Sequence, residues 1–97
     1  MIKIIVTLLT LFSFSLSQAK EVSVGIILGF TGPIESLTPD MSSGAELAFK
    51  EASDSGKLLN GTTLNVIKAD STCIDSAAAT AAAEVLVNHV SAIMGAD

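Results

Sequence analysis

An almost uninterrupted apolar run occupies residues 22–28, in which Ser23 is the only polar residue. Apolar side chains on both faces of the pleat are typical of a central parallel strand that helices cover on both sides. Gly29, Gly32 and Pro33 come next; glycine allows sharp turns and close backbone approach, whereas proline cannot donate to a ladder. The pattern predicts a buried strand that runs into a glycine-rich loop, and open α/β sheets bind ligands at loops of this kind.

Small and apolar residues at helical spacing predict a helix over residues 38–55. Thr38 suits the N-cap, Pro39 the first helical position, and Gly56 the left-handed residue that ends a helix. Glu46 and Lys50 are expected to stay exposed as an i,i+4 ion pair. The face expected toward the sheet consists of Met41, Ala45, Ala48 and Ala52, with Phe49 beside them.

The rest of the chain predicts a strand, a helix and another strand. Asn60-Gly61 is a turn signal before a strand at residues 63–69, whose polar Asn65 and Lys68 suit an edge position. Asp75 is the expected cap of a helix that runs to about residue 88, and residues 90–94 form a third, apolar strand. The inward face of this helix is expected to consist of Ala78, Ala81, Ala82, Val85 and Leu86.

Right-handed crossovers leave two possible orders for three parallel strands. If the third strand lay beyond the second, both helices would cover one face of the sheet and leave the other bare. In the order 2-1-3 the helices cover opposite faces, and the apolar first strand and polar second strand favour this order. We therefore predict an α/β fold, the β-α-β-α-β start of a doubly wound parallel sheet. Its ligand crevice should lie between the first and third strands, at their carboxyl ends.

Residues 1–19 have the pattern of a secretory signal peptide. Lys3 precedes an apolar run at residues 4–16 that is broken only by Thr and Ser, and Ser17-Gln18-Ala19 supplies the small residues of a cleavage site. A helix over residues 4–16 spans about 20 Å, well short of the roughly 30 Å hydrocarbon layer that a membrane anchor must cross. We expect cleavage after Ala19, export to the periplasm, and a mature segment, residues 20–97, that does not span the membrane.

The mature segment is acidic and has few residues suited to catalysis. Its four lysines oppose ten acidic residues, a formal charge of −6, so nucleic acid and anionic lipid are poor partners. Its early glycines lack dinucleotide-loop spacing, and Asp70 is expected to be a loop acid satisfied by nearby donors. His89 has no cysteine or carboxylate at ligand spacing. We therefore predict no metal, no cofactor and no catalytic residue.

Six short segments or single residues, taken together in their order and spacing, carry a resemblance to a known family: Val24-Gly25, Gly32-Pro33, Gly44-Ala45-Glu46-Leu47-Ala48, Gly61, Asp70 and Ile93-Met94-Gly95. Through them, residues 22–97 resemble the opening of the type I periplasmic solute-binding proteins, in the branched-chain amino acid (leucine/isoleucine/valine) branch of ABC importers. The resemblance implies a non-enzymatic protein whose two lobes close on an amino acid or related small polar solute and deliver it to a membrane permease. Residues 20–97 would be the incomplete N-terminal lobe.

The predicted ligand wall is the loop of residues 30–37 together with the stretch that begins at Gly95. Within it, Phe30, Thr31 and Leu37 are the expected wall and orientation contacts. Resembling proteins place an aromatic side chain near the position of Leu37, so the leucine here leaves the identity of the solute open. In that family, the donors to an amino acid's carboxylate and ammonium come mostly from after the third strand and from the second lobe.

Cys73 is the single cysteine of the chain. In resembling proteins, a cysteine in this loop is bonded to one just past the third strand, a position that would here follow Asp97. A buried unpaired thiol is the alternative. Two further function classes stay open: a sensory ligand-binding domain of the same fold, which a downstream membrane span would identify, and a secreted α/β enzyme, which would need a reactive Ser, Cys or His pair.

Overall fold

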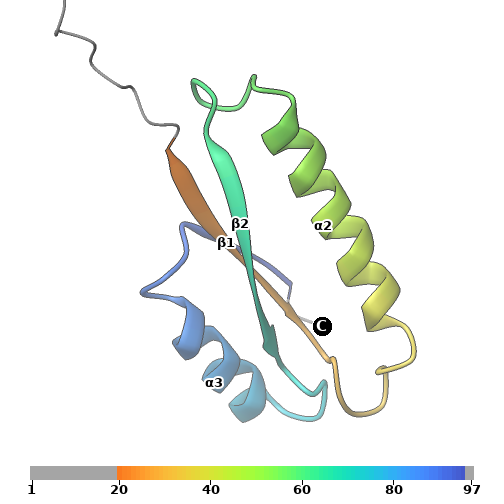
Figure 1. Ribbon diagram of the computed structural model, residues 1–97. Helices are drawn as coiled ribbons and strands as arrows, with labels where there is room; N and C mark the ends of the chain where they lie inside the picture. The colour runs from red at the N-terminus through yellow and green to blue at the C-terminus, as the bar shows by residue number, and fades with distance from the viewer. Residues whose placement is uncertain (1–19, 96–97) are drawn as a thin grey trace, which may run out of the picture.

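The computed structural model describes residues 20–95, and the predicted signal peptide lies outside this range. The described part consists of β1 (Glu21–Leu28), α2 (Thr38–Asp54), β2 (Thr63–Asp70), α3 (Ser76–Leu86) and β3 (Ala92–Met94) (Figure 1). Both strand pairs are parallel, and the sheet order is β2-β1-β3. The predicted α/β fold and the strand order 2-1-3 are confirmed.

β1 is the central strand of the sheet. It pairs with β2 along its whole length, from Glu21↔Thr63 to Leu28↔Asp70, and with β3 near its middle. Its residues are buried from Val24 onward. A strand buried on both faces must be almost wholly apolar, which is what the sequence of β1 shows.

The two helices cover opposite faces of this sheet. Ile27 of β1 packs with Leu86 of α3, whereas Lys68 of β2 points to the other face and forms an ion pair with Glu46 of α2, with 2.9 Å between Nζ and Oε1. Figure 1 shows the helices on either side of the strands. This arrangement is the consequence of two right-handed crossovers in the order 2-1-3.

The inward face of α3 is a narrow stripe. Ala82 and Leu86 are buried as predicted, but Val85 is 65% exposed and Ala81 is exposed as well. Ala83 lies against the core in their place. The helix carries alanine on both flanks of the stripe, so hydrophobicity alone does not fix which flank turns toward the sheet. The predicted cap is confirmed, because the Asp75 carboxylate accepts the Ala78 amide at 2.8 Å.

The start of α2 differs from the prediction. Leu37, not Thr38, occupies the N-cap position, and no side chain caps the helix. Thr38 is fully buried, and its hydroxyl donates to the carbonyl of Gly29 at 3.0 Å. The threonine therefore ties the helix to the end of β1. Gly56 ends the segment with a φ of +68°, as expected.

The sheet-facing side of α2 is also shifted from the predicted one. Thr38 and Ser42 are the buried residues of this helix, whereas Met41 and Ala48 are exposed. Ala45, Phe49 and Ala52 are half-buried, so this part of the predicted face is confirmed. The Thr38 tether sets the rotation of the helix, because a hydroxyl bonded to the strand end must point toward the sheet.

The ion pairs of α2 involve other partners than those predicted. Glu46 pairs with Lys68 of β2 and accepts the Ser42 hydroxyl at 2.7 Å. Lys50 pairs with Asp54, one turn further along the helix. In the sequence, Glu46 and Asp54 both lie four residues from Lys50. Because Lys68 of the neighbouring strand pairs with Glu46, Lys50 pairs with Asp54.

The sheet edges agree in part with the prediction. β2 is an edge strand within the described residues, as its polar residues predicted. β3 is shorter than expected, since only Ala92–Met94 form the strand and all three are exposed. The Ser91 amide donates to the Ser23 carbonyl at 2.8 Å, so the chain reaches the sheet just before the strand begins.

The loops that follow β1 and β2 pack directly against each other at the carboxyl edge. Gly32 has a φ of +99°, and a Cβ there would lie 2.3 Å from the Thr72 carbonyl oxygen. A Cβ on Gly29 would lie 2.9 Å from the Cys73 Cβ. Both glycines are therefore needed for close approach, and Gly32 also for its backbone conformation.

We expect Gly32→Ala to lower the free energy of unfolding by about 1–3 kcal/mol, because it adds a backbone clash to an unfavourable φ. Gly44→Ala is the matched control. A Cβ at Gly44 meets nothing within 4 Å, so this substitution in α2 should raise stability by about 0.5–1 kcal/mol. Urea unfolding of the protein expressed from its complete reading frame measures both. Equal effects of the two substitutions would contradict the packing of these loops.

Candidate functional site

The carboxyl edge of the sheet holds the topological switch point. The chain leaves β1 toward α2 on one face, and β3, on the other side of β1, is reached from α3 on the opposite face. Gly95 follows β3 with a φ of +111°, and a Cβ there would lie 1.9 Å from the Ile27 carbonyl oxygen. The ends of β1 and β3 therefore lie side by side, and ligands of open α/β sheets bind at such a place.

The three predicted contact residues lie on the loop between β1 and α2. Phe30 is half-buried, its amide donates to the Leu28 carbonyl at 2.9 Å, and Lys68 Nζ lies 6.0 Å from the centre of its ring. Leu37 is at the other end of the loop, where it is 60% exposed at the start of α2. Phe30 and Leu37 thus place apolar surface at both ends of this loop.

Thr31 is held by Asp70, the last residue of β2. Its hydroxyl donates to Asp70 Oδ2 at 2.6 Å, and its amide donates to Asp70 Oδ1 at 3.3 Å. The Thr72 amide donates to the same Oδ1 at 2.8 Å. Asp70 is therefore a satisfied loop acid, as predicted. The sequence contained only a weak signal for this pairing: Asp70 ends one strand, and Thr31 lies in the loop after the adjacent strand.

These hydrogen bonds also set the acidity of Asp70. The Thr31 hydroxyl is the largest cause, and the amides of Thr72, Thr31 and Phe30 add to it, so the pKa of Asp70 lies below its ordinary value of 3.8. Partial desolvation acts in the opposite direction and is outweighed. Donors that bond to the ionised form of a carboxyl always favour that form. Asp70 is accordingly a carboxylate at neutral pH.

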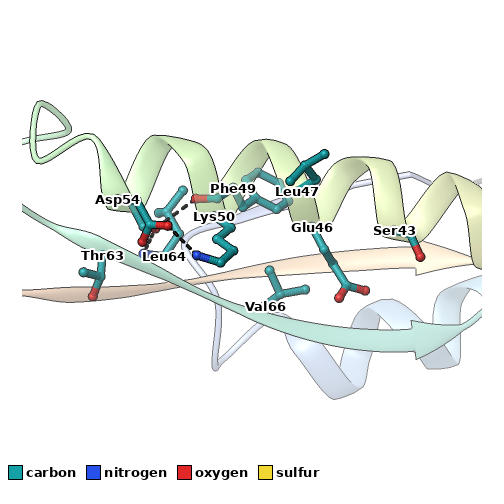
Figure 2. A pocket seen from close by; sticks show the side chains of 10 residues that line it. Ser43, Glu46, Leu47, Phe49, Lys50, Asp54, Thr63, Leu64 and Val66 are labelled. Carbon is teal, nitrogen blue, oxygen red and sulfur yellow. Dashed lines mark hydrogen bonds and ion pairs between the residues drawn. The ribbon is translucent and has the colours of Figure 1, made fainter.

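A sizeable cavity of the described residues lies away from this loop. It is an open groove of about 580 Å³ between α2 and β2, on the outer edge of the sheet. Figure 2 shows Glu46 of α2 and Val66 of β2 on its walls. Neither this groove nor three smaller cavities in the same part of the chain is lined by the predicted contact residues.

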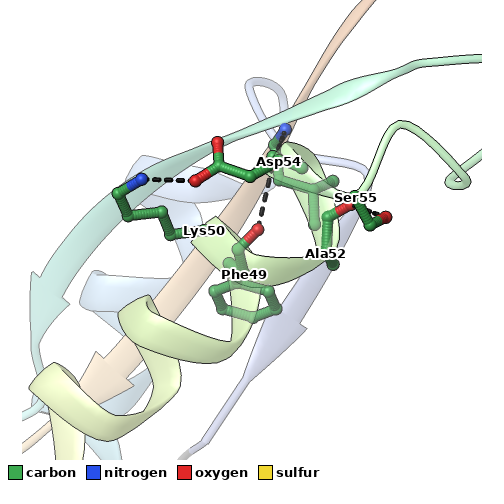
Figure 3. A network of polar contacts seen from close by, with 7 residues as sticks. Phe49, Lys50, Ala52, Asp54 and Ser55 are labelled. Atoms are coloured by element: carbon green, nitrogen blue, oxygen red, sulfur yellow. Dashed lines mark hydrogen bonds and ion pairs between the residues drawn. The ribbon is translucent and has the colours of Figure 1, made fainter.

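Several polar groups of this groove are already bonded. The Ser53 hydroxyl donates to the Phe49 carbonyl at 2.9 Å and accepts the Leu64 amide at 2.8 Å, while Lys50 pairs with Asp54 (Figure 3). Asp54 raises the pKa of Lys50. We therefore interpret the groove as the junction of a helix with an edge strand, and we place the candidate site at the carboxyl edge, where the topological switch point lies.

Residues 20–95 contain no group of His, Cys, Asp and Glu side chains arranged to hold a metal ion. Within the same range, no helix combines the length and the apolar character needed to cross a membrane. Nor does any buried side-chain oxygen or nitrogen in this part of the chain lack a hydrogen-bond partner.

The fold and the switch-point loop define the start of a type I periplasmic-binding-protein fold. A comparison with known protein families matches residues 21–97 to the periplasmic binding proteins. The chain belongs to this family. No curated protein matches it. Membership in the family implies that the protein binds a small molecule and that it is located in the periplasm, and periplasmic binding proteins are typically not enzymes.

The lowered pKa of Asp70 makes stability depend on pH. A carboxyl whose pKa is lower in the folded than in the unfolded state stabilises the fold above its ordinary pKa, and this contribution is lost as the pH falls through the folded value. Asp70→Asn should therefore be less stable than the wild type at about pH 7, and the difference should shrink below about pH 4. Urea unfolding across this range measures it. A difference of the same size at both ends of the range would contradict the role of the charge.

Proposed function

We propose that the protein is the extracytoplasmic substrate-binding component of an ABC importer and that its solute is an amino acid of the branched-chain type or a related small polar molecule. The observation that supports this proposal is the loop between β1 and α2, which follows the central strand of a periplasmic-binding-protein fold and carries the half-buried Phe30 and the exposed Leu37. A membrane permease is the partner that such an importer requires.

The chemistry of the loop favours a solute with an apolar part. Leu37 is exposed at the N-cap position of α2, and Phe30 is half-buried. Apolar surface of this kind gains free energy when a ligand covers it, at about 25 cal/mol per Å². The resemblance to the branched-chain amino acid branch supports the same class, whereas the leucine at position 37, where that branch has an aromatic side chain, extends the proposal to related solutes.

Polar recognition in this proposal comes from outside the described residues. In the resembling proteins, the groups that bind an amino acid's carboxylate and ammonium follow the third strand or belong to a second lobe. The loop described here would supply one wall, and closure of a second lobe would bury the ligand from the other side. One wall alone is an open surface, so in this proposal the ligand is buried only when the second wall closes over it.

Leu37→Asp should weaken amino acid binding by more than about tenfold, because it places a charge against the apolar part of the ligand. The measurement is calorimetry with L-leucine, L-isoleucine and L-valine on the protein expressed from its complete reading frame. Leu47→Asp is the matched control, because Leu47 is 57% exposed, nearly the same as Leu37, but lies on the groove. It should leave the affinity unchanged.

Two results would contradict this assignment. If Leu37→Asp binds like the wild type while Leu47→Asp does not, the site is the groove between α2 and β2. If the protein binds these amino acids, but deletion of its gene leaves their uptake by the cell unchanged, it is not the importer component. Unfolding curves of both variants establish that any loss of affinity is local.

We also propose that Cys73 forms a disulfide with a cysteine shortly after β3, as the resemblance implies. Cys73 is half-buried and has no disulfide partner within residues 20–95. It follows β2, and β2 and β3 flank β1, so the two strand ends lie about 10 Å apart. A few loop residues can cover this distance down to the roughly 4.4–6.8 Å between Cα atoms that a disulfide requires.

Mass spectrometry of the unreduced protein, expressed from its complete reading frame, tests this pairing. We expect Cys73 to resist alkylation until a reductant is added, because a disulfide sulfur is not a nucleophile. The same treatment after unfolding in denaturant separates a disulfide from a merely buried thiol. Alkylation of Cys73 in denaturant without reductant would rule the bridge out.

A further inference from the structure

Asp70 joins the two loops that meet at the carboxyl edge. Its Oδ1 accepts the amides of Thr31 and Thr72, and its Oδ2 accepts the Thr31 hydroxyl. Thr31 belongs to the loop after β1 and Thr72 to the turn after β2, and they are separated by about forty residues of chain. One carboxylate therefore fixes the loop that carries the predicted ligand contacts to a part of the sheet edge that is remote in sequence.

The turn after β2, on which this carboxylate acts, has an unfavourable backbone conformation. Thr72 and Cys73 have φ values of +60° and +50°, in the left-handed region that side chains other than Asn and Asp rarely adopt. The Asp70 carboxylate bonds to the amide two residues on, which is the Asx-turn arrangement that stabilises such a reversal. The same turn places the Thr72 carbonyl against Gly32, so the two loops are in contact at a second point.

Thr31 uses its polar groups for this connection. Its hydroxyl and its amide both donate to Asp70, although the residue itself is exposed. A threonine hydroxyl has a single hydrogen to donate. The donor of Thr31 is thus directed to the protein, and Phe30 and Leu37 remain as the predicted contacts that offer apolar surface.

We infer that Asp70 is a positioning residue for the ligand wall: it orients the loop of residues 30–37 through Thr31, and Thr31 serves this connection instead of donating to the solute. The affinity part of this inference rests on the proposed function. Its structural part does not, because it concerns the order of the loop in the ligand-free protein. Charge-assisted hydrogen bonds are shorter and about twice as strong as neutral ones, which suits a carboxylate to the task.

The test compares four variants of the protein expressed from its complete reading frame. Thr31→Val removes the hydroxyl and keeps the shape, Thr31→Ser keeps the hydroxyl, and Asp70→Ala removes the acceptor. Asp75→Ala is the matched control, because it deletes a carboxylate that lies at the same edge of the sheet and caps α3, and that makes no hydrogen bond to the loop of residues 30–37 among the described residues. Hydrogen exchange of the amides in residues 30–37 reports the order of the loop, and calorimetry with L-leucine, L-isoleucine and L-valine reports affinity.

We expect Thr31→Val and Asp70→Ala each to raise amide exchange in the loop by about tenfold and to weaken binding by about threefold to tenfold. Thr31→Ser should behave like the wild type. Asp75→Ala should lower stability and leave both readings unchanged. The double variant of Thr31→Val with Asp70→Ala should lose no more than the larger single loss, because both substitutions break one connection.

The inference is overturned if Thr31→Val behaves like the wild type in both amide exchange and affinity. It is also overturned if Asp75→Ala changes these two readings as much as Asp70→Ala does, since the effect would then be general destabilisation. If Asp70→Ala does not fold, the pair Thr31→Val and Thr31→Ser still decides. If the wild type binds none of the three amino acids, the proposed solute class fails, and hydrogen exchange alone then decides the role of Asp70.

Discussion

The burial of β1 on both faces is the constraint on which the rest of the structure depends. A strand with apolar side chains above and below the sheet must be covered twice, and the two crossover helices of this chain can do so only in the order β2-β1-β3. The same order places β2 on one side of β1 and β3 on the other, so the connections to these two strands leave in opposite directions. The requirement to bury one strand thus produces the switch point at which the candidate site lies.

The loops at this edge are held by contacts that leave little freedom. Gly32 lies against the Thr72 carbonyl, Thr38 is tied to Gly29, and Asp70 bonds to both loops. A binding wall needs such support, because a surface that must order itself when the ligand arrives loses part of its affinity to that ordering. At the ends of the loop Leu37 stays exposed and Phe30 half-buried, while Thr31 and Gly32 between them are held by the turn after β2.

The outer groove between α2 and β2 shows how cavity size and function can separate. It is larger than the other cavities described, yet its charged side chains are paired, Lys50 with Asp54 and Glu46 with Lys68, and Ser53 covers an edge amide of β2. Covering an outward amide in this way also protects an edge strand from pairing with another chain. The groove is thus explained by the way α2 covers the edge of the sheet, whereas the arrangement of the carboxyl edge is explained by the strand order.

Residues local in sequence determined the elements, the helix cap at Asp75, the turn at Asn60-Gly61 and, through the apolar character of β1, the strand order and the position of the candidate loop. Only the tertiary structure decided how each helix is rotated and which polar groups meet. Thr38 was a plausible cap, but the carbonyl at the end of β1 takes its hydroxyl. Glu46 had Lys50 within reach along the helix, but Lys68 of the adjacent strand is its partner. In α3 both flanks of the stripe are alanine, and the sheet selects one of them. The physical reason is the same in each case: the sequence states what a side chain can bond to or bury, and the choice among equivalent partners belongs to whichever element packs beside it.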